Sequence, residues 1–123
     1  MLTKEQILSA QDLEYQDVDV AEWGGNIRLW QLTVGDRDAF EESISKLTAS
    51  GKAEIIRENF RSKLVARCLG DEQGNRLFSD KEIAQLARKS AKVVDKLFMK
   101  CQEINGMSEE DEERFVKNSE GEG

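Results

Sequence analysis

Carboxylates are the most abundant side chains in this sequence that could carry out acid–base chemistry or bind a metal ion. The 123 residues include 25 Asp and Glu but no histidine, so histidine-based triads, imidazole bases and His-rich metal sites are excluded. Most carboxylates fall on the polar faces or near the starts of predicted helices, where solvation or capping explains them. No glycine-rich loop carries the lysine and serine of a phosphate-binding motif. We therefore expect no enzymatic activity and no cofactor.

One stretch has the spacing of a calcium-binding loop. With Asp71 as position 1, Glu82 falls at position 12, and oxygen-bearing side chains occupy positions 3, 5 and 9 between them. Position 6, however, is Arg76, where such a loop requires glycine. Ser79 and Glu82 also have the spacing of a helix capping box, which explains both residues. We prefer an ordinary turn followed by a helix, with a small calcium-binding helical module as an alternative.

The two cysteines and the chain start indicate a cytosolic protein. Cys68 and Cys101 each lie on an apolar helical stripe, which favours buried thiols in a reducing compartment over a disulfide or a metal site. The first residues lack the cationic and apolar regions of a signal peptide. No apolar run is long enough to span a bilayer. We expect no contact with a membrane.

Trp23 and a row of lysines are the candidate partner-binding residues. Trp23 lies at the start of a loop beside two glycines, where we expect it to be exposed, and tryptophan is a favoured interface anchor. Trp30 is instead expected to cover the inner face of a hairpin. Four lysines spaced by three or four residues are predicted to form a ridge on the last long helix: Lys89, Lys92, Lys96 and Lys100. This ridge is either a solvated face or a docking surface for an acidic partner or for the acidic tail of the chain itself.

The charge of the chain is concentrated at its two ends. Residues 1–22 hold six acidic side chains and one lysine, and residues 108–123 hold seven acidic and two basic ones. Because the whole chain carries −7, residues 23–107 carry +3. The overall charge argues against binding to nucleic acid. An acidic protein that imitates DNA and inhibits a nucleic-acid-binding host factor stays as an alternative, although the basic middle of the chain speaks against it.

The first half of the chain is predicted to form a short helix, a hairpin and a second helix. Thr3 and Gln6 have the spacing of a capping box, so a helix is expected to begin there. Strands over residues 17–20 and 27–32, on either side of Gly24-Gly25, predict a β-hairpin. Thr33 is expected to cap a helix that continues to residues 49–51. The buried side of that helix is marked by Phe40, Ile44 and Leu47.

The second half is predicted to be helical. Apolar residues recur every fourth position over residues 53–69: Ile56, Phe60, Leu64 and Cys68. Gly70 is expected to end this helix in the left-handed conformation. A turn over residues 71–75 and the Ser79 cap lead to a short helix, in which Phe78 and Ile83 form a hydrophobic staple.

A final long helix should begin near Ser90, stop at Asn105-Gly106 and pack against the helix over residues 53–69. Ser108 is expected to cap an acidic segment that extends to residue 116. The sequence thus predicts a mainly α (α+β) fold, with four to six helices and an N-terminal β-hairpin in one domain over residues 1–116. A disordered acidic tail is expected over residues 117–123.

Several stretches occur in an order that resembles one known family. These are DVDVAEWGG (17–25), GDRDAFE (35–41), NFR (59–61), LVARCL (64–69), DEQGNRLF (71–78), LF (97–98) and INGMSEED (104–111). This order resembles that of the tail assembly chaperones of long-tailed (siphovirus-type) phages and prophages. The resemblance covers about residues 15–112, and it consists of packing and turn residues rather than a catalytic signature.

The resemblance implies a non-enzymatic chaperone of the phage tail. It would bind the tape-measure protein, with the tail-tube protein as a second candidate client, and keep its clients soluble until the tube polymerises. It would act in the host cytoplasm and be absent from the mature virion. Neither nucleic acid nor a membrane is implied as a partner, and self-association is left open.

Overall fold

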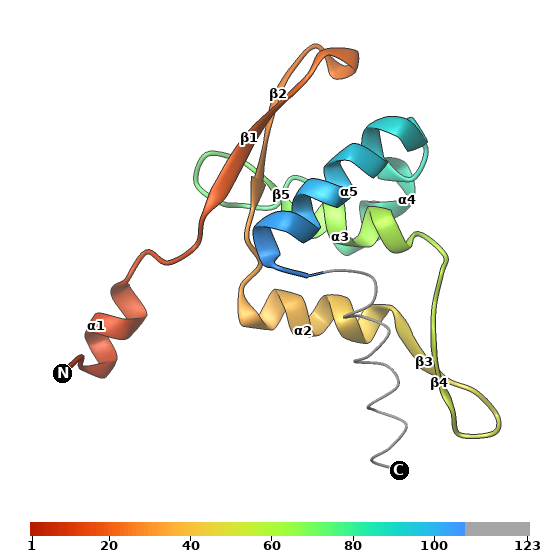
Figure 1. The fold of residues 1–123 in the computed structure, drawn as a ribbon, viewed down its shortest axis with the longest axis horizontal. Coiled ribbons are helices and arrows are strands. Elements are labelled where there is room, and N and C mark those ends of the chain that lie inside the picture. Colours follow the sequence, from red (N-terminus) through yellow and green to blue (C-terminus); the bar gives the residue numbers. More distant parts are fainter. Residues whose placement is uncertain (108–123) are drawn as a thin grey trace.

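The computed structural model describes residues 1–107, in which helices, short strands and turns alternate (Figure 1). In chain order the elements are α1 (Lys4–Ser9), β1 (Tyr15–Val20), η1 (Ala21–Trp23), β2 (Gly25–Trp30), α2 (Val34–Ser43), β3 (Ser45–Leu47), β4 (Ala53–Ile55), α3 (Phe60–Cys68), β5 (Leu69–Gly70), η2 (Asp80–Glu82), α4 (Ile83–Leu86) and α5 (Ala91–Asn105). The predicted α+β class with an N-terminal β-hairpin is confirmed. The predictions for the Ser108 cap, the acidic segment and the tail lie outside the described residues.

The N-terminal hairpin forms the centre of a small antiparallel sheet. β1 pairs with β2 from Tyr15↔Trp30 to Val20↔Gly25, and β5 adds to the other side of β2, which gives the order β1-β2-β5. Because side chains alternate between the faces of a strand, Leu29 faces the core whereas Trp30 faces away from it. The prediction that Trp30 covers the inner face is therefore wrong, and valines from β1 cover that face instead.

Gly70 does not end a helix in the left-handed conformation, as predicted, but lies in β5 and has no positive φ. Its role is to admit the Trp30 indole. A Cβ at this position would lie 2.7 Å from Trp30 Cδ1 and 3.2 Å from the Asn75 carbonyl oxygen. The indole has little freedom to move away, because its Nε1–H donates a hydrogen bond of 2.9 Å to the Asp71 carbonyl and Tyr15 packs against its ring.

The substitution Gly70→Ala is expected to lower the free energy of unfolding by about 1–3 kcal/mol, because the added methyl group displaces the indole or the backbone. Gly25→Ala is the matched control. Gly25 also lies in a strand of this sheet without a positive φ, but its Cβ would meet nothing within 4 Å. Urea denaturation of both variants measures the difference. Equal free energies of unfolding for the two variants would show that the position of the Trp30 indole does not require a glycine at residue 70.

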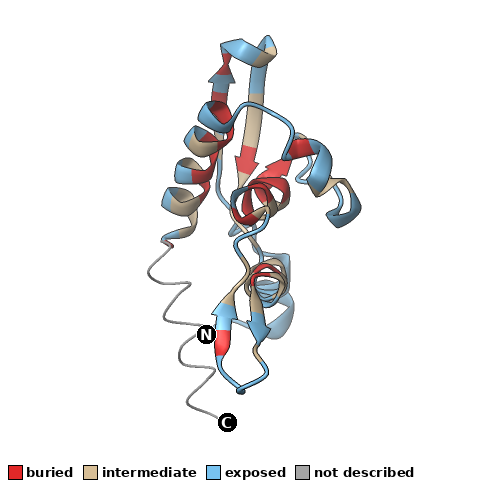
Figure 2. Cartoon of the chain, turned by 90° about the vertical axis from the view of Figure 1, so that its right-hand side faces the viewer, coloured by how far each residue is buried: buried red, intermediate tan, exposed pale blue. Residues whose placement is uncertain are grey.

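The core lies between the inner face of the hairpin and the helices, as the buried residues in Figure 2 show. Phe60 at the start of α3 is packed between Phe40 of α2 and Phe98 of α5, with ring centroids 5.9 and 5.8 Å away. Cys68 and Cys101 are buried free thiols, as predicted. A hydrogen bond with Cys68, together with burial, raises the pKa of the Cys101 thiol well above its usual value.

Two of the predicted helices are shorter than the sequence suggested. α2 ends at Ser43, and a β3–β4 hairpin with the register Ser45↔Ile55 occupies the chain up to α3. Leu47, predicted to be buried, is 73% exposed on this hairpin. The predicted helix over residues 53–69 begins only at Phe60. Asn59 before it has a left-handed φ of 55°, which no right-handed helix can contain.

The helix N-caps predicted within residues 1–107 are confirmed. Thr3 and Ser79 each form a capping box, and the Ser90 hydroxyl accepts the Val93 N–H at the start of α5. Gly106 ends α5 in the left-handed conformation. α5 packs against α3, as predicted. α1, in contrast, buries none of its residues and stands apart from the rest (Figure 1).

No helix within residues 1–107 is both long enough and apolar enough to cross a membrane.

Candidate partner-binding surface

The tip of the N-terminal hairpin lies beside the corner between α4 and α5. Trp23 belongs to η1 at this tip and is half-buried against the core, rather than exposed as predicted. Lys89 comes from the turn between α4 and α5, and its Nζ lies 6.0 Å from the centre of the Trp23 ring. This distance is at the outer limit of a cation–π contact. The structure therefore brings together two of the residues predicted to bind a partner.

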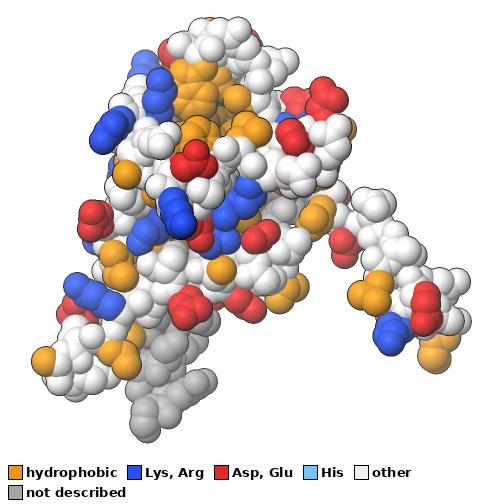
Figure 3. Space-filling model, turned by 180° about the vertical axis from the view of Figure 1, so that it is seen from behind, with side chains coloured by type: hydrophobic (Ala, Val, Ile, Leu, Met, Phe, Trp, Pro, Cys, Tyr) orange, Lys and Arg blue, Asp and Glu red, His pale blue; other side chains and the backbone are white. Residues whose placement is uncertain are grey.

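Three further apolar side chains on neighbouring elements are also only partly buried. Ile27 of β2, Phe78 before η2 and Ile83 of α4 are each half-buried against the core. Seen from behind, hydrophobic side chains gather below the hairpin tip, with Lys and Arg on one side and Asp and Glu on the other (Figure 3). We call Trp23, Lys89 and the hydrophobic side chains gathered below the tip in this view the hairpin-tip surface. Its half-buried apolar groups retain area that a partner can cover.

The remaining predicted lysines lie on α5. Lys92, Lys96 and Lys100 are spaced by four residues and so share one side of the helix. Lys89 lies outside the helix, before the Ser90 cap, so the predicted ridge of four lysines on one helix is reduced to three. Lys96 reaches the hairpin, where its Nζ donates a hydrogen bond of 3.4 Å to the Asp19 carbonyl of β1. Lys96 thus borders the hairpin, and Lys92 and Lys100 lie on the same side of α5.

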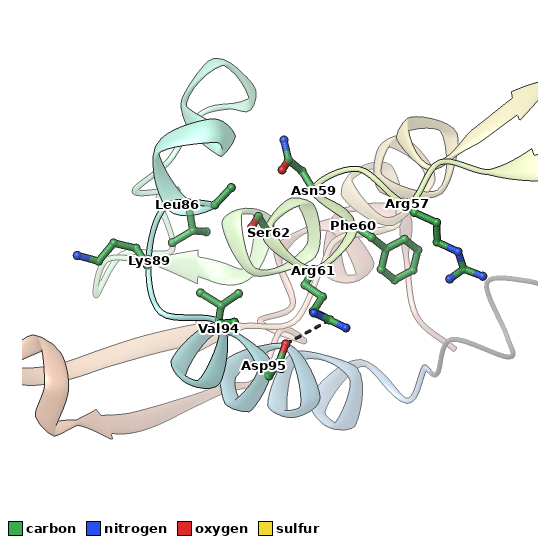
Figure 4. Close-up of a pocket in the computed structure, with 11 residues that line it drawn as sticks. Arg57, Asn59, Phe60, Arg61, Ser62, Leu86, Lys89, Val94 and Asp95 are labelled. Atoms are coloured by element: carbon green, nitrogen blue, oxygen red, sulfur yellow. Dashed lines mark ion pairs between the residues drawn. The ribbon is translucent and has the colours of Figure 1, made fainter.

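A pocket of about 330 Å³ lies between the start of α3 and the α4–α5 corner (Figure 4). Leu86 and Val94 contribute apolar walls. Arg61 Nε of α3 lies 3.2 Å from Asp95 Oδ1 of α5. Lys89 also lines this pocket, so the pocket and the hairpin-tip surface share one cation. Three basic side chains and one carboxylate line the pocket: Arg57, Arg61, Lys89 and Asp95. This charge balance suits an acidic partner.

Sequence reasoning missed a cluster on the outer face of the hairpin. Arg28 makes two hydrogen bonds to the Asp17 carboxylate, at 2.7 and 3.0 Å, and its guanidinium lies 3.8 Å from the centre of the Tyr15 ring. The hydrogen bond from Arg28 lowers the pKa of Asp17. These residues are brought together by the pairing of β1 with β2. The cluster could therefore be predicted from the sequence only if the register of the two strands were known.

The carboxylates with calcium-loop spacing are used within their own loops. The Asp71 carboxylate accepts the backbone N–H groups of Asn75 and Gln73, both at 2.9 Å, and these bonds lower its pKa. Glu82 accepts the Ser79 N–H at 2.9 Å, which lowers its pKa as well. Within residues 1–107 no three His, Cys, Asp or Glu side chains are grouped so that they could hold a metal ion.

The structure is thus that of a small α+β protein, and its hairpin-tip surface is partly apolar with charged side chains on either side. The phage tail assembly chaperone family matches residues 3–115 of the chain. The protein therefore belongs to this family, as the order of its sequence motifs predicted.

A solved structure has the same fold. The tail assembly chaperone of bacteriophage HK97 superposes with a TM-score of 0.55 and 18% sequence identity. The match covers 81% of this chain and 94% of the HK97 chain. No curated protein matches the sequence.

Proposed function

We propose that this protein binds the tape-measure protein of its phage and keeps it soluble while the tail is assembled. The observation that carries the proposal, beyond membership of the family, is the hairpin-tip surface. There Trp23 retains uncovered area beside Lys89, on elements that are held by the core. The tail-tube protein is a second candidate client. In this proposal the chaperone acts in the host cytoplasm, has no catalytic activity and is absent from the finished virion.

A chaperone for a long client has to cover apolar surface without trapping it. The hairpin-tip surface suits this task, because tryptophan and other apolar side chains supply binding energy when a partner covers them. The lysines of α5 attract acidic residues of the client and increase the rate of encounter. Such contacts weaken as salt is added, since exposed charges are screened. The apolar contacts are much less sensitive to salt.

The proposal is tested by binding of the purified chain to tape-measure segments that tile the whole client. We expect co-elution of the chain with at least one segment in size-exclusion chromatography. Light scattering should show less aggregation of the segment with the chain than without it. The affinity of the chain for the segment should decrease as the salt concentration is raised. A tape-measure protein whose segments and full length neither bind nor gain solubility would overturn the proposal. Binding of the tail-tube protein alone would replace the tape-measure protein as the client.

A further inference from the structure

The strand β2 is only partly paired on the side of β5. β5 has two residues, which pair with Arg28 and Leu29 near the C-terminal end of β2. After Gly70 the chain turns away into the loop of residues 71–75, which closes with a hydrogen bond from the Asp71 N–H to the Asn75 carbonyl. The first half of β2, from Gly25 to Ile27, therefore has β1 on one side and no described strand on the other.

The backbone of Asn26 points into this unpaired side. The Gln31 N–H donates to the Glu14 carbonyl at 2.9 Å, which identifies these two residues as a hydrogen-bonded pair. In an antiparallel ladder such pairs alternate with non-bonded ones. By this alternation Arg28 directs its N–H and C=O toward Gly70, and Asn26 directs its own to the same side. Within residues 1–107 no residue on that side bonds to the Asn26 backbone.

An open groove of about 560 Å³ occupies the place where β5 would have continued. β2 forms one wall, through Asn26 and Ile27, and Leu77 with the loop of residues 71–75 forms the other. Leu77 is 51% exposed, so the groove offers apolar contacts as well as a free strand edge. The loop wall is fixed in advance, because the Asp71 carboxylate binds two of its N–H groups and the Asp71 carbonyl accepts the Trp30 indole.

The groove has an acidic rim. Asp17, Asp71 and Glu72 line it together with Arg28. Arg28 is paired with Asp17 and also interacts electrostatically with Glu72. Because three carboxylates face this single basic side chain, the lining keeps a net negative charge. A basic partner is therefore favoured at this site, in contrast to the cationic pocket beside Lys89.

We propose that this groove binds an extended, basic segment of a partner protein, which pairs with Asn26 as an added strand beside β2. Main-chain hydrogen bonds supply affinity in this mode of recognition, and alternate side chains supply specificity. One side of the added strand meets Ile27 and Leu77, and a lysine or arginine of the segment lies near Asp71 and Glu72. This proposal does not depend on the tape-measure proposal, because it does not require the tape-measure protein to supply the segment.

The test uses the full chain, immobilised, and a displayed library of random twelve-residue peptides. We expect selected peptides that contain lysine or arginine and alternate polar with β-branched residues. The affinity of a selected peptide is then measured by fluorescence anisotropy for the wild type and for Asn26→Pro. This substitution removes an N–H that β1 does not use, and we expect at least a tenfold loss of affinity, about what the loss of one or two hydrogen bonds gives.

Asp19→Pro is the matched control, because Asp19 lies directly opposite Asn26 in the register and points its N–H to the far edge of the hairpin. We expect its affinity to stay within about twofold of the wild type, as small surface effects allow. Should Asn26→Pro fail to fold, a pair of charge variants replaces it. Glu72→Lys changes the charge of the groove, and Glu42→Lys on α2 is its control. Only Glu72→Lys is expected to weaken binding.

The proposal is overturned if no peptide is enriched, if the selected peptides are acidic, or if the groove variants bind as well as their controls. Loss of peptide binding in the groove variants alone supports it. Failure of the tape-measure segments to bind, with peptide binding intact, would overturn the proposed function and leave the groove established.

Discussion

Replacing Phe60 with alanine is expected to lower the free energy of unfolding by about 3–5 kcal/mol, the range for a buried phenylalanine. Phe60 is only 6% exposed. Its ring makes edge contacts with Phe40 and Phe98, which add to the loss from burial alone. Because α2, α3 and α5 meet at this ring, the cavity cannot be filled by a shift of one helix. Denaturation by urea, followed by circular dichroism, measures the loss.

The matched control for Phe60 is Met99→Ala on α5. Met99 is 67% exposed, so its truncation should change the stability by less than about 0.5 kcal/mol. If Phe60→Ala lowered the free energy of unfolding by a similarly small amount, the Phe60 ring would not be what holds α2, α3 and α5 together. Loss of cooperative unfolding in Phe60→Ala would agree with the expected effect, since a domain of this size has little stability to spare.

Replacing Trp23 with alanine is expected to weaken binding to the tape-measure segment by about 2 kcal/mol or more, roughly a thirtyfold rise in Kd. The reason is that Trp23 offers the largest apolar side chain of the hairpin-tip surface and lies beside Lys89. Trp23→Phe should lose less, because it keeps a ring against the same neighbours. Isothermal titration calorimetry with the binding segment gives the two values.

Leu47→Ala serves as the control for Trp23. Leu47 is an exposed apolar residue on the separate β3–β4 hairpin, and its truncation should leave Kd unchanged. Thermal unfolding of each variant shows whether the fold is kept, since Trp23 also contacts the core. Equal affinities of Trp23→Ala and the wild type would exclude the hairpin-tip surface as the client site.

Local signals in the sequence predicted the element boundaries that depend on local chemistry. The capping boxes at Thr3 and Ser79, the hydroxyl cap at Ser90 and the glycine stop at Gly106 all occur where predicted. Each of them needs only a few consecutive residues to form its hydrogen bonds. The N-terminal hairpin could be predicted for the same reason, because its signal, alternating side chains on either side of two glycines, also lies within a short stretch of the chain.

Strand pairing and contacts between distant side chains decided the parts that could not be predicted. Ile44 and Leu47 have a spacing that also suits a helix, yet the β3–β4 hairpin forms in its place, and Leu47 is left exposed. Gly70 looks like a helix stop, but the Trp30 indole from a distant strand is what requires a glycine there. The strand that pairs with Leu47 follows within a few residues but has only three residues of its own, whereas the indole belongs to a strand far from Gly70 in the sequence.

The candidate site was predicted in part. Trp23 and Lys89 were selected for separate reasons, and the contact between them arises because the α4–α5 corner packs beside the hairpin tip. That placement depends on the whole core. The groove beside β2 gave no sequence signal, because a two-residue strand such as β5 has no alternating pattern to recognise.

The soluble fraction of the full-length tape-measure protein, co-expressed with this chain, tests the central claim most directly. We predict that the wild-type chain raises this fraction and that a Trp23→Ala, Lys89→Glu variant of equal expression and stability does not. The claim would be contradicted by a tape-measure protein that is equally insoluble with and without the wild-type chain. Equal protection by the double variant would contradict the assignment of the hairpin-tip surface.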